Sequence, residues 1–361
     1  MTMNGVYLYA VIDSSADSEL GSPGLDGKGL VSVIAGRGLG CVVSHYEGAP
    51  FEAQPKEVIL RNLLAHQRVV EQAMKGHTVL PVKFGTLLSD PREVEAFLSS
   101  HCSLLAQALE SIRDKVEVEM AATWDTGRVL QELSTEKEIA SAREAMASRE
   151  PTVADRVRLG QMVKGYMDRR RKAYQERMIS LLSPVAVDVA FNALVSDEMV
   201  MNVAFLLEKS SCSLFEDKLS ALDRAFRNEI DFRLIGPLPP YSFSTLAVVK
   251  LRWQEIRHAM DMLGLQRIES EAEVRRAYRR LAAEEQHGPD TAVHTGVPPD
   301  DLKRASDLLL KCLGARDAHH EEPGSCRTLN IDAVEDMLMV ATTARSQEDI
   351  EPARFGAALE V

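Results

Sequence analysis

Residues 6–12 read VYLYAVI, a short run of β-branched, aromatic and aliphatic side chains. Such a run predicts a strand, and the expected fold is built outward from it. Composition and apolar spacing predict the next elements: a loop at 14–29, strands at 30–35 and 41–45, a helix at 55–75, a strand at 78–88, a helix at 90–112 and a strand at 115–124. This order is close to a ferredoxin-like β-α-β-β-α-β plan with one extra hairpin strand. We therefore expect a sheet with two helices on one face and the other face available for contact.

The chain then favours helices, followed by a second mixed region. Residues 126–182 predict two helices split at Glu150-Pro151, the second with the basic cluster Asp168-Arg169-Arg170-Arg171-Lys172. The cluster is interpreted as a site for an anionic partner or, in preference, as a solvated face paired with nearby acids. The remaining predictions are a hairpin at 186–195 and 199–208, a helix at 212–228, a strand at 231–236, helices at 244–263, 271–286 and 299–313, and a short helix at 331–342.

Composition narrows the possible partners. The 361 residues hold 42 Lys+Arg and 54 Asp+Glu, a net charge of −12, which argues against nucleic acid as a partner. No apolar segment is long enough to span a bilayer, and the first residues do not form a signal peptide, so we expect no membrane partner. The five cysteines show no CxxC spacing, which predicts reduced thiols in a cytoplasmic protein.

No motif indicates catalysis. The turn Gly36-Arg37-Gly38-Leu39-Gly40 has the spacing of a phosphate loop, but it leads into a strand rather than a helix, which favours a hairpin. His319-His320-Glu321-Glu322 with Cys326 lacks the paired spacing of a zinc site. Walker A, HExxH and GxSxG motifs are absent from the sequence. We therefore expect no enzyme activity, no catalytic residues, no cofactor and no metal.

Several segments resemble the gas vesicle protein F/L family. They are VYLYAV at 6–11, EVILRNLLAHQRVVE at 57–71, VLPVKFGT at 79–86, NVAFLL at 202–207 and FRLIGPLPPYSF at 232–243. Together they span about residues 4–252 in the family's order. The resemblance implies a non-enzymatic structural or assembly protein in the gas vesicle, within the cytoplasm. Its implied partners are the vesicle shell protein and other vesicle accessory proteins.

The strand with Pro81 is a candidate contact for the shell protein. An assembly factor for an apolar subunit needs exposed strand edges or apolar faces, and a proline limits pairing along an edge. The candidate residues are Val79, Pro81, Val82 and Phe84. The alternative interpretation is that Val79, Val82 and Phe84 are core residues.

Residues 253–314 resemble a second family, the J-domain co-chaperones. The segment SEAEVRRAYRRLA at 270–282 is similar to the family's second helix and keeps a basic face at Arg275, Arg276, Arg279 and Arg280. The family's His-Pro-Asp loop corresponds to His287, Pro289 and Asp290, with Gly288 inserted after the histidine. The resemblance implies Hsp70 as a further partner, and a degenerate three-helix contact module is the alternative.

The combined prediction is an α+β protein. Its parts are an N-terminal modified ferredoxin-like domain at 1–125, a helical connector at 126–185, a second small α+β domain at 186–252, a C-terminal three-helix J-like module at 253–314 and a flexible tail at 315–361. The predicted function is that of a gas vesicle assembly protein that binds the shell protein. The alternative function is an adaptor that delivers a client to Hsp70.

Overall fold

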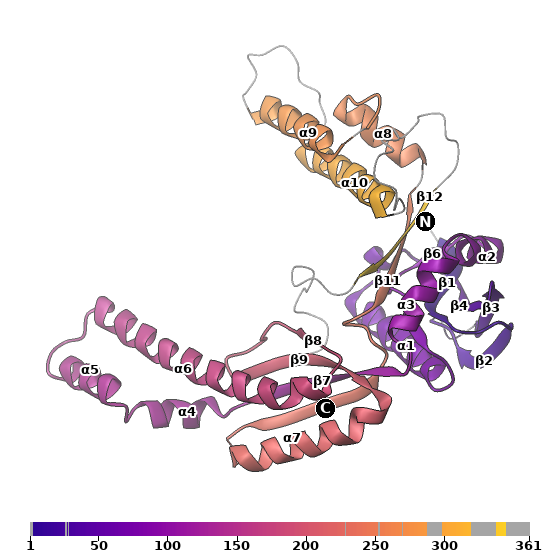
Figure 1. Ribbon diagram of the computed structural model, residues 1–361. Coiled ribbons are helices and arrows are strands. Elements are labelled where there is room, and N and C mark those ends of the chain that lie inside the picture. Colours follow the sequence, from indigo (N-terminus) through magenta and orange to yellow (C-terminus); the bar gives the residue numbers. More distant parts are fainter. Residues whose placement is uncertain are drawn as a thin grey trace.

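The computed structural model describes residues 3–286, 298–318 and 337–343, apart from residues 26, 28, 228, 252 and 269. Within these residues the chain forms a mixed α and β structure with a six-stranded, a four-stranded and a two-stranded sheet. Figure 1 shows the two larger sheets side by side. A helical arm extends from one of them, and a group of three helices stands beyond the two-stranded ribbon.

The first sheet is built around β1 (Met3–Ile12), the strand predicted from residues 6–12. Its order is β2-β3-β4-β1-β5, and β6 also pairs with β1. The remaining strands are β2 (Ser18–Pro23), β3 (Leu30–Gly36), β4 (Leu39–Gly48), β5 (Val79–Pro81) and β6 (Leu87–Leu88). All recorded pairings in this sheet are antiparallel. The loop expected at 14–29 therefore contains an edge strand, β2, whose polar composition gave no strand signal.

Helices cover both faces of the first sheet. Tyr7 and Tyr9 of β1 point toward α1 (Lys56–Met74), whose Val69 and Val70 share their core. Leu8 of β1 belongs to the opposite core, with the side chains of α2 (Pro91–Ser100) and α3 (Cys102–Ser111). The expectation of one free sheet face is therefore wrong. The unbroken apolar run at 6–12 is typical of a strand that is buried on both sides.

The glycine-rich turn is a β-hairpin, as predicted. Arg37 and Gly38 both have positive φ, 57° and 81°, which is the conformation of a two-residue type I′ turn. β3 and β4 pair on either side of it, from Gly36 opposite Leu39 to Ser32 opposite Val43. The turn leads directly into β4 rather than into a helix, so it lacks the helix N-terminus that a phosphate loop requires.

The second sheet has the order β10-β7-β9-β8. Its strands are β7 (Lys115–Thr123), β8 (Asp188–Phe191), β9 (Met199–Glu208) and β10 (Asp231–Leu238). The predicted hairpin of β8 and β9 is confirmed. The expectation that 115–124 closes the first sheet is wrong, because β7 pairs with β9 and β10. An alternating pattern predicts that a segment is a strand, but it does not determine the strand's neighbours.

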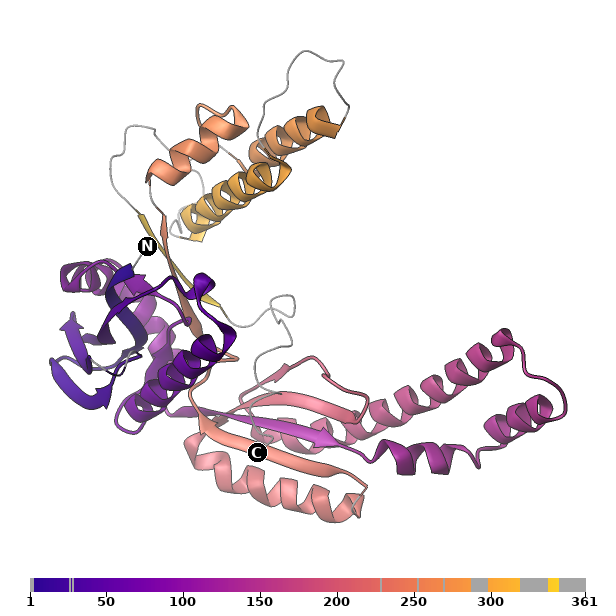
Figure 2. The same ribbon diagram turned by 180° about the vertical axis from the view of Figure 1, so that it is seen from behind.

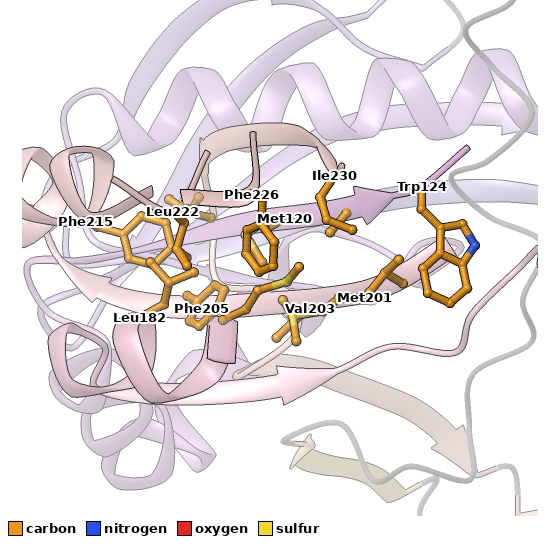
Figure 3. Packing of buried hydrophobic residues seen from close by; sticks show 14 of the residues in the cluster. Met120, Trp124, Leu182, Met201, Val203, Phe205, Phe215, Leu222, Phe226 and Ile230 are labelled. Carbon is orange, nitrogen blue, oxygen red and sulfur yellow. The ribbon is translucent and has the colours of Figure 1, made fainter. Parts of the chain in front are cut away.

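One face of the second sheet carries α6 (Val153–Leu182) and α7 (Cys212–Phe226). Figure 3 shows Leu182 of α6 and Phe215, Leu222 and Phe226 of α7 gathered over Met120 and Phe205 of the sheet. The rings of Phe205 and Phe215 lie 4.9 Å apart. Burial of non-polar side chains is the main contribution that stabilises such a unit.

The helical arm consists of α4 (Thr126–Leu133), α5 (Lys137–Ala147) and the first half of α6. α6 begins after Pro151 with a capping box, in which the Thr152 hydroxyl and the Asp155 carboxylate each bond the other's backbone N–H. The basic cluster lies on this helix. Arg170 pairs with Glu132 at 2.7 Å and Arg171 with Asp168 at 3.0 Å. These contacts agree with a helix face paired with nearby acids.

The C-terminal part begins with β11 (Thr245–Leu251) and continues through α8 (Trp253–Leu263), α9 (Glu271–Gln286) and α10 (Pro299–Ala318) to β12 (Met337–Thr343). β11 and β12 pair antiparallel along their whole length. The helix expected at 244–263 is therefore half strand, and residues 337–342 of the short helix expected at 331–342 are strand as well. Pairing between distant segments has overridden their local preference. Short 3-10 turns occur at Phe51–Ala53, Ser183–Val185 and Lys209–Ser211.

Candidate interaction surfaces

The predicted contact strand lies in the core of the first sheet. Val79 and Val82 are 3% and 1% exposed, and Pro81 is also buried. β1 covers one side of the strand, with Ala10 opposite Pro81. β11 covers the other side just beyond it, where Val82 forms a parallel bridge with Leu246 and the Lys83 N–H donates to the Leu246 carbonyl at 2.8 Å. This edge is therefore already occupied by the chain itself.

Phe84 is half-buried in an aromatic cluster. Its ring centroid lies 5.1 Å from that of Phe51, 5.8 Å from that of His66 and 6.2 Å from that of Tyr7. His66 and Tyr7 are bonded through Nδ1 and Oη at 2.9 Å. Burial lowers the pKa of His66 to about 4, with a hydrogen bond to the Val82 backbone opposing the shift. The imidazole is thus neutral around pH 7, packed among aromatic rings.

A buried carboxylate joins the second sheet to the segment that precedes β11. Glu117 of β7 is 1% exposed and Ser242 is 3% exposed. The Ser242 N–H and hydroxyl donate to the two carboxylate oxygens of Glu117, each at 2.7 Å. A buried carboxylate is tolerated only when it is hydrogen-bonded in this way. Sequence reasoning missed this contact, because Glu117 and the partly exposed Glu119 occupy equivalent places in one alternating pattern.

Glu117→Ala should lower the free energy of unfolding by about 3 kcal/mol, because the buried Ser242 N–H loses a charged acceptor. Equilibrium urea unfolding followed by circular dichroism measures the change. Glu208→Ala, at the exposed end of β9, is the matched control and should change the stability by less than about 0.5 kcal/mol. Equal losses for the two variants would contradict the structural role of Glu117.

An open groove of about 860 Å³ lies between α1 and the segment that connects β2 to β3. Val58, Ala65 and Leu25 supply apolar walls, and the exposed Arg61 and Arg68 stand along the helix side. The outer surface of the same helix exposes Leu60 and Leu64, at 43% and 39%. The apolar positions whose spacing predicts this helix do not include these two leucines; they are Val58, Ile59, Leu63, Val69, Val70 and Met74.

The α9 arginines form the exposed basic face that the sequence predicts. Arg275, Arg276, Arg279 and Arg280 are all exposed, and Arg275 pairs with Glu271 at 3.2 Å. α8, α9 and α10 enclose their own core, in which Leu302 is fully buried. His287, Pro289 and Asp290 lie outside the described residues.

Potential metal ligands form no cluster in the described part of the chain. No group of three or more His, Cys, Asp or Glu side chains is arranged to hold a metal there. His319, His320 and Cys326 are outside the described residues. Cys41, Cys102, Cys212 and Cys312 are free thiols. Burial raises the pKa of Cys312 to about 11, which keeps that thiol protonated and unreactive at neutral pH. Among the described helices, none is long and apolar enough to cross a bilayer.

The fold corresponds to a known class of protein. The family model of gas vesicle synthesis protein GvpL/GvpF matches residues 5–245, and the chain belongs to this family. It is therefore a gas vesicle protein of the structural and accessory kind.

Particular relatives extend the comparison. Gas vesicle protein F of Streptomyces sp. (strain CB03234) is 30% identical over 242 residues, which cover 66% of this chain and 98% of that protein. Gas vesicle protein F of Dolichospermum flosaquae is 25% identical over 247 residues, with coverages of 67% and 98%. The crystal structure of GvpF from Anabaena sp. PCC7120 is similar in fold, with a TM-score of 0.58, 23% identity and coverages of 66% and 97%. These three relatives are thus matched over nearly their whole length by about two thirds of this chain.

Proposed function

We propose that this protein binds the major shell protein while a gas vesicle forms, and that it acts at the gas vesicle. The observation that carries the proposal is family membership over residues 5–245, a match that includes both larger sheets and the arm. The proposed contact is the outer face of α1, because Leu60 and Leu64 are exposed one helical turn apart. An apolar shell subunit would bury these two side chains on binding.

Loss of this face should weaken capture of the shell protein. In a pull-down with tagged full-length protein, Leu60→Asp/Leu64→Asp should retain about a tenth or less of the shell protein, since a charge at each leucine opposes apolar burial. The matched control is Val153→Asp/Val157→Asp, which charges another exposed pair at the same spacing, on the arm. Equal capture by both double variants would contradict the α1 site.

Flotation of cells tests the biological role. Cells that lack the protein should fail to form floating vesicles, and the full-length chain should restore them. Normal vesicles in the deleted cells would contradict the assembly function itself. Vesicles restored by the α1 variant as well as by the full-length chain would contradict only the α1 site. The predicted contribution of Val79, Pro81, Val82 and Phe84 stays a prediction; it requires β11 to leave the strand edge that it covers.

A second candidate function rests on the α8–α10 module. Its three-helix core and exposed Arg275, Arg276, Arg279 and Arg280 support a J-like contact with an Hsp70 chaperone. If the module acts in this way, the full-length chain stimulates Hsp70 ATPase activity, and replacement of all four arginines by alanine abolishes the stimulation. Lys303→Ala/Arg304→Ala, on the exposed side of α10, is the control for charge loss. An ATPase rate that the full-length chain leaves unchanged would contradict this candidate.

A further inference from the structure

β8 is an edge strand with little protection. Within the described residues it pairs only with β9, at the end of the second sheet opposite β10. Large apolar side chains are exposed along it and just beyond its ends: Val187 is 50% exposed, Phe191 49% and Val195 51%. Natural proteins usually blunt such edges with lysine, proline, a bulge or a covering segment. Residues 187–195 contain neither lysine nor proline.

Three other edge strands of the two larger sheets carry such protections. β2 contains Glu19 and Pro23, and it is fastened to α1 because Ser22 and the Leu20 carbonyl both bond Gln72. β10 carries Arg233 and Pro237. β5 is covered by β11. β8 has one charged residue, Asp188, and no lysine, proline or described covering segment, which leaves its apolar edge open for a partner.

The register shows which backbone groups of β8 face outward. Ala190 lies opposite Ala204 and Phe191 opposite Val203, and the Asn192 N–H donates to the Asn202 carbonyl at 2.8 Å. Because antiparallel bonding alternates along a strand, the even-numbered residues are directed toward β9 and Val189 and Phe191 are directed away from it. The Val189 N–H meets the carboxylate of its neighbour Asp188 at 2.8 Å, a local contact that does not involve another strand.

We propose that this edge pairs with the same edge of a second copy of the chain, antiparallel and centred on Ala190. In that register Val189 faces Phe191 of the second copy, and the two-fold axis generates the same pair a second time. These two pairs exchange the backbone hydrogen bonds, and apolar side chains flank both. Asp188 then lies opposite the uncharged side chain of Asn192, so no like charges face each other. A parallel in-register arrangement would instead place Asp188 opposite Asp188. The segment is thus self-complementary about one residue, as a two-fold interface requires.

Cysteine cross-linking tests the register directly. Only the residue on the two-fold axis faces itself, and a non-hydrogen-bonded antiparallel pair brings two Cβ atoms within disulfide range. Under mild oxidation, full-length Ala190→Cys should form a covalent dimer. Asp188→Cys and Asn192→Cys should each form no covalent dimer alone and should cross-link when mixed. Wild-type protein is the negative control, because any cross-link through the native cysteines would appear there as well.

A backbone variant tests the pairing without a cross-link. Val189→Pro removes an N–H that is directed away from β9, so the fold and its circular dichroism spectrum should be kept. Its dimer dissociation constant in sedimentation equilibrium should rise at least about tenfold over wild type. The proposal is overturned if wild type sediments as a monomer at every concentration tested, if Ala190→Cys fails to cross-link, if Asp188→Cys cross-links alone equally well, or if Val189→Pro dimerises like wild type.

Discussion

Leu246→Ala should lower the free energy of unfolding by about 2–5 kcal/mol, the range for a leucine removed from a well-packed core. Leu246 is fully buried and belongs to the same core as Leu8, Phe97 and Leu105 of the first sheet and its helices. It reaches that core from β11, far along the chain. Its backbone also bonds Lys83, next to β5. The stability falls for two reasons: the variant buries less apolar surface, and the missing side chain leaves a cavity that neighbouring sheet strands cannot fill.

Equilibrium urea unfolding of the full-length chain measures this effect. Leu214→Ala, the same change at a side chain that is 53% exposed on α7, is the matched control and should cost less than about 1 kcal/mol. If the first sheet unfolds separately from the rest, hydrogen exchange at β1 and β5 should accelerate in the Leu246 variant and not in the control. A Leu246 variant as stable as the control would mean that β11 does not complete the first core.

Acidification below pH 6.5 should destabilise the protein through His66 in particular. The imidazole titrates near pH 6.5 when the chain is unfolded, and burial holds its pKa at about 4 in the folded protein. Between these values the unfolded chain binds a proton that the folded chain rejects. The free energy of unfolding contributed by this group is therefore fully present above pH 6.5. It falls by about 3 kcal/mol as the pH drops to about 4.

His66→Gln isolates this contribution from that of the carboxylates that titrate in the same range. Glutamine keeps a hydrogen-bonding side chain but takes up no proton, so the variant's stability should fall less steeply between pH 6.5 and 4 than that of wild type. His45→Gln, which changes an exposed histidine, is the matched control. Identical pH profiles for His66→Gln and wild type would show that folding does not shift the pKa of His66.

Local elements were predictable from sequence wherever the signal was local. The apolar run at 6–12 identifies a strand, although its burial on both faces appears only in the structure. The turn at 36–40 identifies a hairpin, and the structure adds the positive φ of Arg37 and Gly38. The spacing of Val69, Val70 and other apolar residues identifies α1. Each of these features is specified by residues within about ten positions of one another, which is the range that periodicity can report.

Long-range pairing was not predictable in the same way. Nothing in the alternation of residues 115–123 distinguishes a last strand of the first sheet from the strand between β9 and β10. Residues 245–251 suit a helix locally, and become a strand because β5 and β12 offer partners. The candidate site has the same limit. Pro81 was recognised at a sheet edge, but the segment that covers this edge begins more than a hundred residues later.

The β11–β12 ribbon determines how far the α8–α10 module can act. Because the module is inserted between two paired strands, it is held at both ends rather than trailing on a single linker (Figure 2). Seven residues per strand correspond to a stiff spacer of about 23 Å, at about 3.3 Å per residue. A ligand held by the module is therefore separated from the first sheet by the length of this ribbon. Two weak contacts, one at each end of this spacer, would then act together with a high effective concentration.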